Sequence, residues 1–148
     1  MLETRKKAAH SYLSMIWDYD QVLSNLRDEI DALYERASGV SSPGMDSDHV
    51  QMTITGASPQ ERILPQLLTD LETYKNKYNR YLRLRKKRVD QINRMSDWRY
   101  CRILYLTYIR GWHSPQIAEE MGYNIDYIRV LRGEALKAFD LKYLKQKN

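Results

Sequence analysis

The sequence predicts an all-α protein in which a long, coiled-coil-like antiparallel helical hairpin is followed by a compact helix-turn-helix unit. In two long segments, apolar residues recur at alternating intervals of three and four, which is the period of one helix face. Farther along the chain, two shorter amphipathic segments flank a glycine-bearing turn, as in helix-turn-helix motifs. We therefore expect a hairpin over residues 1–95 and a helix-turn-helix domain over residues 96–148.

The composition fits a folded protein without disulfides. The chain has 148 residues, of which 43% are hydrophobic, and this is enough to fill a core. Its single cysteine, Cys101, excludes an intramolecular disulfide, and its apolar neighbours favour a buried structural thiol. Because no apolar run is long enough for a signal peptide or a membrane span, we expect a cytoplasmic protein that does not bind membranes.

The first long segment, residues 5–37, is expected to form one helix with a heptad seam. Such a seam needs a partner, either from this chain or from another copy. The seam residues are Ala9, Tyr12, Ile16, Tyr19, Leu23, Leu26, Ile30, Leu33 and Ala37.

Residues 38–57 lack a helical period and are expected to form a long connection, with a short extended piece near residues 50–55. His49 in this loop has no second metal ligand nearby, so we interpret it as an exposed loop residue.

The second long helix is expected to begin with a capping box at Ser58 and Glu61, with Pro59 at the first helical position, and to end near residue 95. It matches the first helix in type and approximate length, which favours an antiparallel hairpin. Its seam consists of Leu64, Leu67, Leu71, Tyr74, Tyr78, Tyr81, Ile92 and Met95.

The second helix also carries a basic run, for which two interpretations are open. The run is either a solvated face, paired with acidic residues of the first helix, or a phosphate-contacting surface; we favour the first, because most charge runs are solvated. The basic residues are Arg80, Arg83, Arg85, Lys86, Lys87 and Arg88, and the acidic ones are Asp28, Glu29, Asp31 and Glu35.

Charge is distributed unevenly along the chain, whose net charge is +5. Residues 1–58 carry five basic and nine acidic side chains, whereas residues 59–148 carry 19 basic and 10 acidic ones. Positive charge in the second part, which ends in Lys142, Lys145 and Lys147, suits a phosphate backbone, although an acidic protein partner would select the same charge.

A third helix, residues 97–110, is apolar on nearly all sides and is expected to be buried beneath the two short helices that follow. Between these two, Gly122 is suited to ending the first helix in a left-handed conformation and Asn124 to capping the second. The expected inward residues are Ile117, Ala118 and Met121, then Ile128, Leu131, Ala135, Leu136 and Phe139.

The outward face of the last helix is a mixed polar surface that fits a DNA major groove. Gly133 within it costs about 1 kcal/mol relative to Ala inside a helix, so its presence needs a reason, such as close approach to a phosphate or to the preceding helix. The outward residues are Ile125, Asp126, Tyr127, Arg129, Val130, Arg132 and Gly133.

The sequence lacks recognisable catalytic motifs. It contains no phosphate-cradling glycine loop, no pair of Cys or His at metal-ligand spacing and no nucleophile elbow. His10, His49 and His113 are scattered, and the Glu119–Glu120 pair is explained by solvation. We therefore expect a protein that is not an enzyme and has no cofactor or metal site.

Three pieces of the sequence between Arg99 and Leu136 carry a family resemblance: Tyr-Ile-Arg-Gly, Ile-Ala-Glu-Glu-Met-Gly and a closing Ala-Leu. This run resembles the fourth region of sigma-seventy-type factors. Together with VSSPGM and HVQ in the loop and LRGEAL near the end, the whole chain resembles the ArpU-like and RinA-like late-gene regulators of phages.

The resemblance implies a phage or prophage protein in the cytoplasm of a bacterial host, with a sigma-region-four-like DNA-binding domain that activates late genes. Two positions depart from the family pattern. His113-Ser114-Pro115-Gln116 replaces the usual Ser or Thr followed by Glu, which can shift the helix start by one residue, and Asn124 replaces a capping Ser.

We hypothesise that the recognition helix, from Asn124 to about Asp140, enters the major groove of double-stranded DNA while the preceding helix start holds a phosphate. The hairpin would then pair copies, with a dimer favoured, or contact RNA polymerase. The candidate DNA-binding residues are Ser114, Gln116, Asn124, Asp126, Tyr127, Arg129, Val130, Arg132, Gly133 and Lys137.

Two alternatives stay open. A small-terminase-like packaging protein also joins a helix-turn-helix to long helices, but it works as a multi-subunit ring. An interaction protein could instead use its sigma likeness to bind polymerase without binding DNA. A complete sigma factor is disfavoured, because the acidic hairpin lacks a recognisable promoter-melting region.

Overall fold

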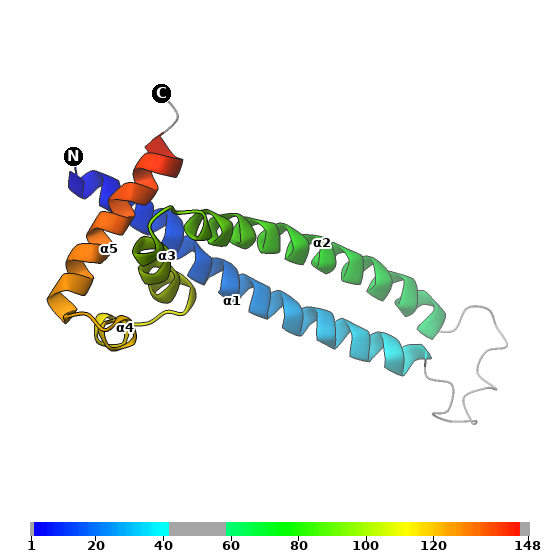
Figure 1. Cartoon of the computed structure of the whole chain (residues 1–148). Coiled ribbons are helices and arrows are strands. Elements are labelled where there is room, and N and C mark those ends of the chain that lie inside the picture. Colours follow the sequence, from blue (N-terminus) through cyan, green and yellow to red (C-terminus); the bar gives the residue numbers. More distant parts are fainter. Residues whose placement is uncertain (1, 42–58, 146–148) are drawn as a thin grey trace. The chain divides into compact units, whose positions relative to one another are not determined.

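The computed structural model describes residues 2–41 and 59–145, and within these ranges every element is helical and no strand occurs. This confirms the predicted all-α class. The elements in chain order are α1 (Leu2–Ser41), α2 (Pro59–Asn93), α3 (Trp98–Leu104), the π-helix η2 (Tyr105–Ile109), α4 (Ser114–Met121), α5 (Ile125–Phe139) and the π-helix η3 (Asp140–Leu144) (Figure 1).

The chain divides into two compact units. The first combines Met1–Gln21 with Arg83–Asn148, and the second is Val22–Leu82. The boundary predicted between residues 95 and 96 lies inside the first unit, so the division into a hairpin domain and a helix-turn-helix domain stays a prediction.

The long helices differ modestly from their predicted bounds. α1 continues beyond the last seam residue, Ala37, and takes in residues 38–41 of the expected loop, because a helix that is already nucleated propagates without a packing partner at every position. α2 begins at Pro59, as predicted. The expected cap at Ser58, the Glu61 side chain, His49 and the extended piece at residues 50–55 lie outside the described residues.

In the second unit, the last turns of α1 pack against the first turns of α2. Leu33 of α1 is buried with Leu67 and Leu71 of α2. Closer to the other end of this unit, Arg27 Nη2 donates to Tyr78 Oη at 3.1 Å. Residues late in one helix therefore meet residues early in the other, and the two segments run in opposite directions within this unit.

The first unit contains the larger core, to which the predicted seam and all the short helices contribute. Phe139 of α5 is fully buried there, with its ring centroid 5.8 Å from that of Tyr12 in α1. The buried members are Ala9, Leu13, Ile16, Ile92, Met95, Ile103, Leu104, Leu106, Tyr108, Ile117, Ile128, Leu131, Ala135, Leu136 and Phe139.

Leu13 is a core residue that the heptad pattern missed. It is fully buried although it lies outside the seam through Ala9, Tyr12 and Ile16. The seam assumes one packing partner, whereas the first turns of α1 contribute to a core shared with α2, α3, α4 and α5. A helix with several partners buries more than one stripe.

Two expectations about the third helix need correction. The helix at residues 97–110 was expected to be buried on nearly all sides, but its Trp98 is 65% exposed, because this residue occupies the first position of α3, where the chain enters from the solvent-exposed segment around Ser96. Cys101 is only half-buried; its Sγ lies 3.0 Å from the Met95 carbonyl oxygen, and burial raises the pKa of the thiol.

Arg85 and Arg88 of the basic run lie in the first unit and contact residues of α1 other than the expected acidic ones. Arg85 Nε lies 2.6 Å from Asp20 Oδ1, and the Arg88 guanidinium stacks 4.0 Å above the Tyr12 ring centroid. Arg80 lies in the second unit together with the expected acidic partners, and among the described residues of that unit it makes no ion pair with Asp28, Glu29, Asp31 or Glu35.

Leu13→Ala should destabilise the protein by about 2–5 kcal/mol, because it leaves a cavity in a core made by several helices. Met15→Ala, two residues away and 37% exposed, is the matched control and should change stability by less than about 1 kcal/mol. Urea unfolding followed by circular dichroism measures both. Equal effects of the two substitutions would show that Leu13 does not belong to the core.

Candidate nucleic-acid interface

The turn between α4 and α5 has the cap geometry that its sequence predicts. Gly122 ends α4 in the left-handed conformation, with φ of 72° and its N–H donated to the Ala118 carbonyl. Asn124 then caps α5, because its Oδ1 accepts a hydrogen bond from the Asp126 N–H at 2.7 Å. The connection between the two helices is short, and the N–H groups of Gly122 and Tyr123 both donate to the Ala118 carbonyl oxygen.

The start of α4 is held by a capping box. α4 begins at Ser114 with His113 as its N-cap residue, and the Gln116 side-chain oxygen accepts the His113 N–H at 3.0 Å. Pro115 occupies the first turn, where its missing N–H costs nothing. The side-chain oxygen of Gln116 therefore holds the helix start, while the Ser114 hydroxyl is left for another partner.

Three of the predicted contact residues form an exposed stripe on α5. Asp126 and Arg129 are exposed and form an ion pair across one helical turn, with Arg129 Nη1 3.4 Å from Asp126 Oδ1. Val130 next to them is 55% exposed. Gly133 and Lys137 continue the stripe at helical spacing, and both are half-buried.

Arg132 differs from the expectation that it faces outward. Its Nε donates to Thr107 Oγ1 at 3.2 Å and its Nη2 donates to Ser114 Oγ at 3.0 Å. Burial lowers the pKa of this guanidinium, and the nearby Arg129 lowers it further. Arg132 therefore links α5 to η2 and to the start of α4, because the planar guanidinium reaches two acceptors in a fixed geometry.

Tyr127 is also engaged within the protein. Its hydroxyl accepts a hydrogen bond from Arg99 Nη1 at 2.9 Å, and its ring meets that of Tyr123 edge to face, with centroids 5.1 Å apart. Arg99 in turn binds Asp97, the N-cap residue of α3, whose pKa is held below its ordinary value by the hydrogen bonds from Arg99. The hydroxyl of Tyr127 thus ties the first turn of α5 to α3.

The neighbour that explains Gly133 comes from the other end of the chain. A Cβ placed on Gly133 would lie 3.1 Å from Nζ of Lys6 in α1 and 3.2 Å from its Cε. Among the described residues, the close neighbour of Gly133 is thus α1 and not the preceding helix. Lys6 could not be found from sequence as a neighbour of α5, since 126 residues separate the two positions and neither belongs to an apolar pattern.

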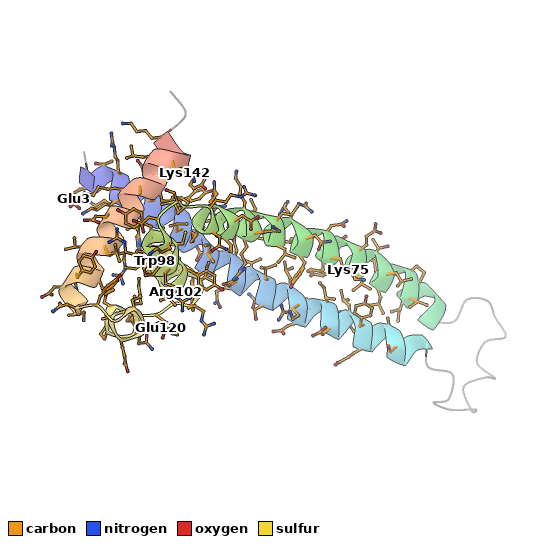
Figure 2. All side chains as sticks on the ribbon, in the orientation of Figure 1. Glu3, Lys75, Trp98, Arg102, Glu120 and Lys142 are labelled. Atoms are coloured by element: carbon orange, nitrogen blue, oxygen red, sulfur yellow. The ribbon has the colours of Figure 1, made fainter. Side chains whose placement is uncertain are left out.

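α3 and α4 are joined on the surface by an ion pair. The labelled side chains of Arg102 and Glu120 belong to these two helices (Figure 2), and Arg102 Nη2 lies 3.0 Å from Glu120 Oε1. Both side chains are more than 40% exposed, so the pair contributes at most about 1 kcal/mol. Glu120 is therefore a surface residue, as predicted, with a partner that the sequence did not indicate.

A groove lies beside the exposed Trp98. It encloses about 450 Å³ and is lined by Asn93, Trp98, Cys101, Arg102, Tyr105 and Arg110. Aromatic and arginine side chains of this kind are enriched at protein–protein interfaces.

Over residues 2–41 and 59–145, no three Asp, Glu, His or Cys side chains gather closely enough to hold a metal ion. In the same part of the chain, no helix combines the length and apolar character needed to cross a membrane.

Comparison with known proteins found no matching family model, no matching curated protein and no matching solved structure. The resemblance to phage late-gene regulators therefore stays a prediction from the motifs.

Arg132→Ala should lower the free energy of unfolding by about 1–2 kcal/mol, because it removes two hydrogen bonds of a charged, half-buried group. Arg132→Lys should recover only part of this loss, since one ammonium group cannot reproduce the planar fork. Arg129→Ala, on the exposed side of the same helix, should change stability by at most about 0.5 kcal/mol. Chemical denaturation compares the three; a neutral Arg132→Ala would contradict the linking role.

Asp97→Asn should lower the melting temperature at pH 7 while preserving the cap, because Asn caps helices as well as Asp does. The folded-state pKa of Asp97 is lowered, so its stabilisation is present above the unfolded-state pKa of about 3.9 and is lost as the pH falls through the folded-state value. The difference from wild type should therefore shrink below about pH 4. Thermal melts at pH 7 and pH 3, with the exposed Asp18→Asn as control, measure it; a difference that persists at pH 3 would contradict the charge effect.

Proposed function

We propose that this chain is a transcription regulator that binds double-stranded DNA through a helix-turn-helix formed by α4 and α5. One observation carries the proposal: α5 is capped, buried on one side and anchored by Arg132 and Tyr127, while its opposite side presents Asp126, Arg129 and Val130 to solvent. A helix held this firmly with a mixed polar and apolar outer stripe suits direct reading of base edges.

Within this proposal the residues have different roles. Arg129 is the candidate for contact with a base edge or phosphate, and Val130 supplies an apolar contact of the kind that a thymine methyl group accepts. Ser114 and the N–H groups at the start of α4 would bind a backbone phosphate. Arg132 contributes indirectly, since it holds Ser114 in place, and it adds positive charge next to this helix start.

The wider assignment rests on the resemblance of the motifs to the fourth region of sigma factors and to ArpU-like and RinA-like proteins. In this assignment the regulator is a phage or prophage protein that activates late genes. The long helices α1 and α2 form an antiparallel hairpin that pairs two copies or contacts RNA polymerase. The antiparallel contacts of Arg27 with Tyr78 and of Leu33 with Leu67 support a hairpin in the second unit.

Arg129→Ala should weaken specific DNA binding by about 1–3 kcal/mol, the usual contribution of a direct base contact. Duplexes selected from a random pool by the wild-type protein provide the probe, and fluorescence anisotropy at about 0.15 M salt provides the affinity. Arg36→Ala removes the same charge from an exposed position of the second unit and should leave the affinity nearly unchanged. Equal affinities of wild type and Arg129→Ala would remove α5 from the interface.

Other outcomes point to the alternative functions. If the wild-type protein shows no salt-sensitive DNA binding, the proposal is wrong, and capture of RNA polymerase that depends on Trp98 would favour the interaction protein. The groove beside the exposed Trp98 of this chain is the surface to test for polymerase binding. A multi-subunit ring in light scattering, together with DNA binding, would favour the packaging protein over a dimeric regulator.

A further inference from the structure

The end of the Lys6 side chain packs closely against Gly133 of α5. Its Nζ and Cε lie 3.1 and 3.2 Å from the position that a Cβ of residue 133 would take, a distance tighter than ordinary van der Waals contact. In the first unit, the amino-terminal part of α1 thus crosses close to α5 (Figure 1). Any larger side chain at position 133 would have to share this space with the lysine.

The ammonium group of Lys6 is only weakly neutralised. Its ion-pair partner among the described residues is Glu3, at 4.0 Å, whose side chain is 80% exposed while that of Lys6 is 33% exposed. A pair of this length between two residues of one helix is worth only a few tenths of a kcal/mol in water. The charge therefore stays available to a stronger anionic partner.

The position of Gly133 places this charge on the proposed DNA-facing side of α5. Positions 126, 129, 130, 133 and 137 share one helix face, so the Lys6 ammonium lies on the stripe between Val130 and Lys137. Asp126 on that stripe is paired with Arg129, and the exposed Glu134, which borders the stripe next to Val130, accepts a hydrogen bond from Tyr100 Oη at 3.5 Å. A cation from a second helix is thus inserted into a surface that already carries Arg129 and Lys137.

We propose that the amino-terminal part of α1 belongs to the nucleic-acid interface and that Lys6 contacts a backbone phosphate of double-stranded DNA across Gly133. This inference rests on the proposed function. A lysine ammonium is a compact point charge that suits a phosphate and carries no base specificity. Lys6 would therefore contribute affinity and register for every sequence, and its loss would leave base preference unchanged.

The salt dependence of binding tests this directly. The logarithm of the association constant falls linearly with the logarithm of the salt concentration, and each neutralised phosphate makes this fall steeper by about 0.9. Lys6→Gln should therefore make the slope shallower by about 0.9 and weaken binding about fivefold at 0.15 M salt. Lys7→Gln is the matched control, because it removes the same charge from the next residue of the same helix, whose side chain points about 100° away from that of Lys6 around the helix axis. It should change the slope by much less.

Gly133→Ala supplies a second, independent readout. The methyl group should shift the flexible end of Lys6 by a few tenths of an ångström and weaken DNA binding slightly, while the melting temperature rises because Ala is the better helix former. In a Lys6→Gln background, Gly133→Ala should have little further effect on the slope. A protein that becomes more stable but binds DNA less well would separate the interface role from a structural one.

The outcomes separate failure of this inference from failure of the proposed function. If wild type binds DNA and Arg129→Ala weakens it, but Lys6→Gln and Lys7→Gln have equal slopes, Lys6 has no phosphate contact and the inference is wrong while the function stands. If wild type shows no salt-dependent binding, the proposed function and this inference both fail. Altered base preference in Lys6→Gln would also overturn the inference.

Discussion

Burial of Phe139 in a core shared by several helices is the constraint on which the first unit depends. α3 and α4 contain only seven and eight residues, and helices of that length are not stable alone in water. Phe139 lies next to Tyr12 of α1 and, with a centroid distance of 4.9 Å, next to Tyr143 of η3. The short helices therefore exist because the long ones complete their core.

Tyr12 shows how that core is fixed in place. Its ring contacts Phe139 on α5 and lies beneath the Arg88 guanidinium of α2, while its hydroxyl donates to Gln91 Oε1 at 2.7 Å. Arg88 also donates to the Tyr12 carbonyl oxygen at 3.0 Å. One aromatic side chain with a polar tip thus joins three helices, which is the use to which tyrosine is suited at half-buried seams.

The same division between anchored and free side chains shapes the face of α5. Arg132 forms hydrogen bonds with Ser114 and Thr107, and Tyr127 forms one with Arg99. These bonds fix α5 against α3, η2 and α4. A surface that is to read DNA must be held rigidly by such contacts, since a loosely placed helix loses the geometry of its hydrogen bonds. Residues that look equivalent on a helical wheel thus differ in whether their groups are left for a ligand.

The sequence alone determined the helical class, the approximate bounds of the long helices, the left-handed turn at Gly122 and the cap at Asn124, because these depend on local periodicity and on backbone chemistry within a few residues. It also predicted all five buried residues of α5, since a single stripe is buried there.

Only the tertiary structure decided the rest. The burial of Leu13, the exposure of Trp98, the partners of Arg132 and the approach of Lys6 to Gly133 depend on which helices surround a residue, and the period of one helix carries no information about its neighbours. For the same reason, the acidic balance of the first 58 residues gave no sign that Lys6 lies beside α5 in the net-basic second part of the chain.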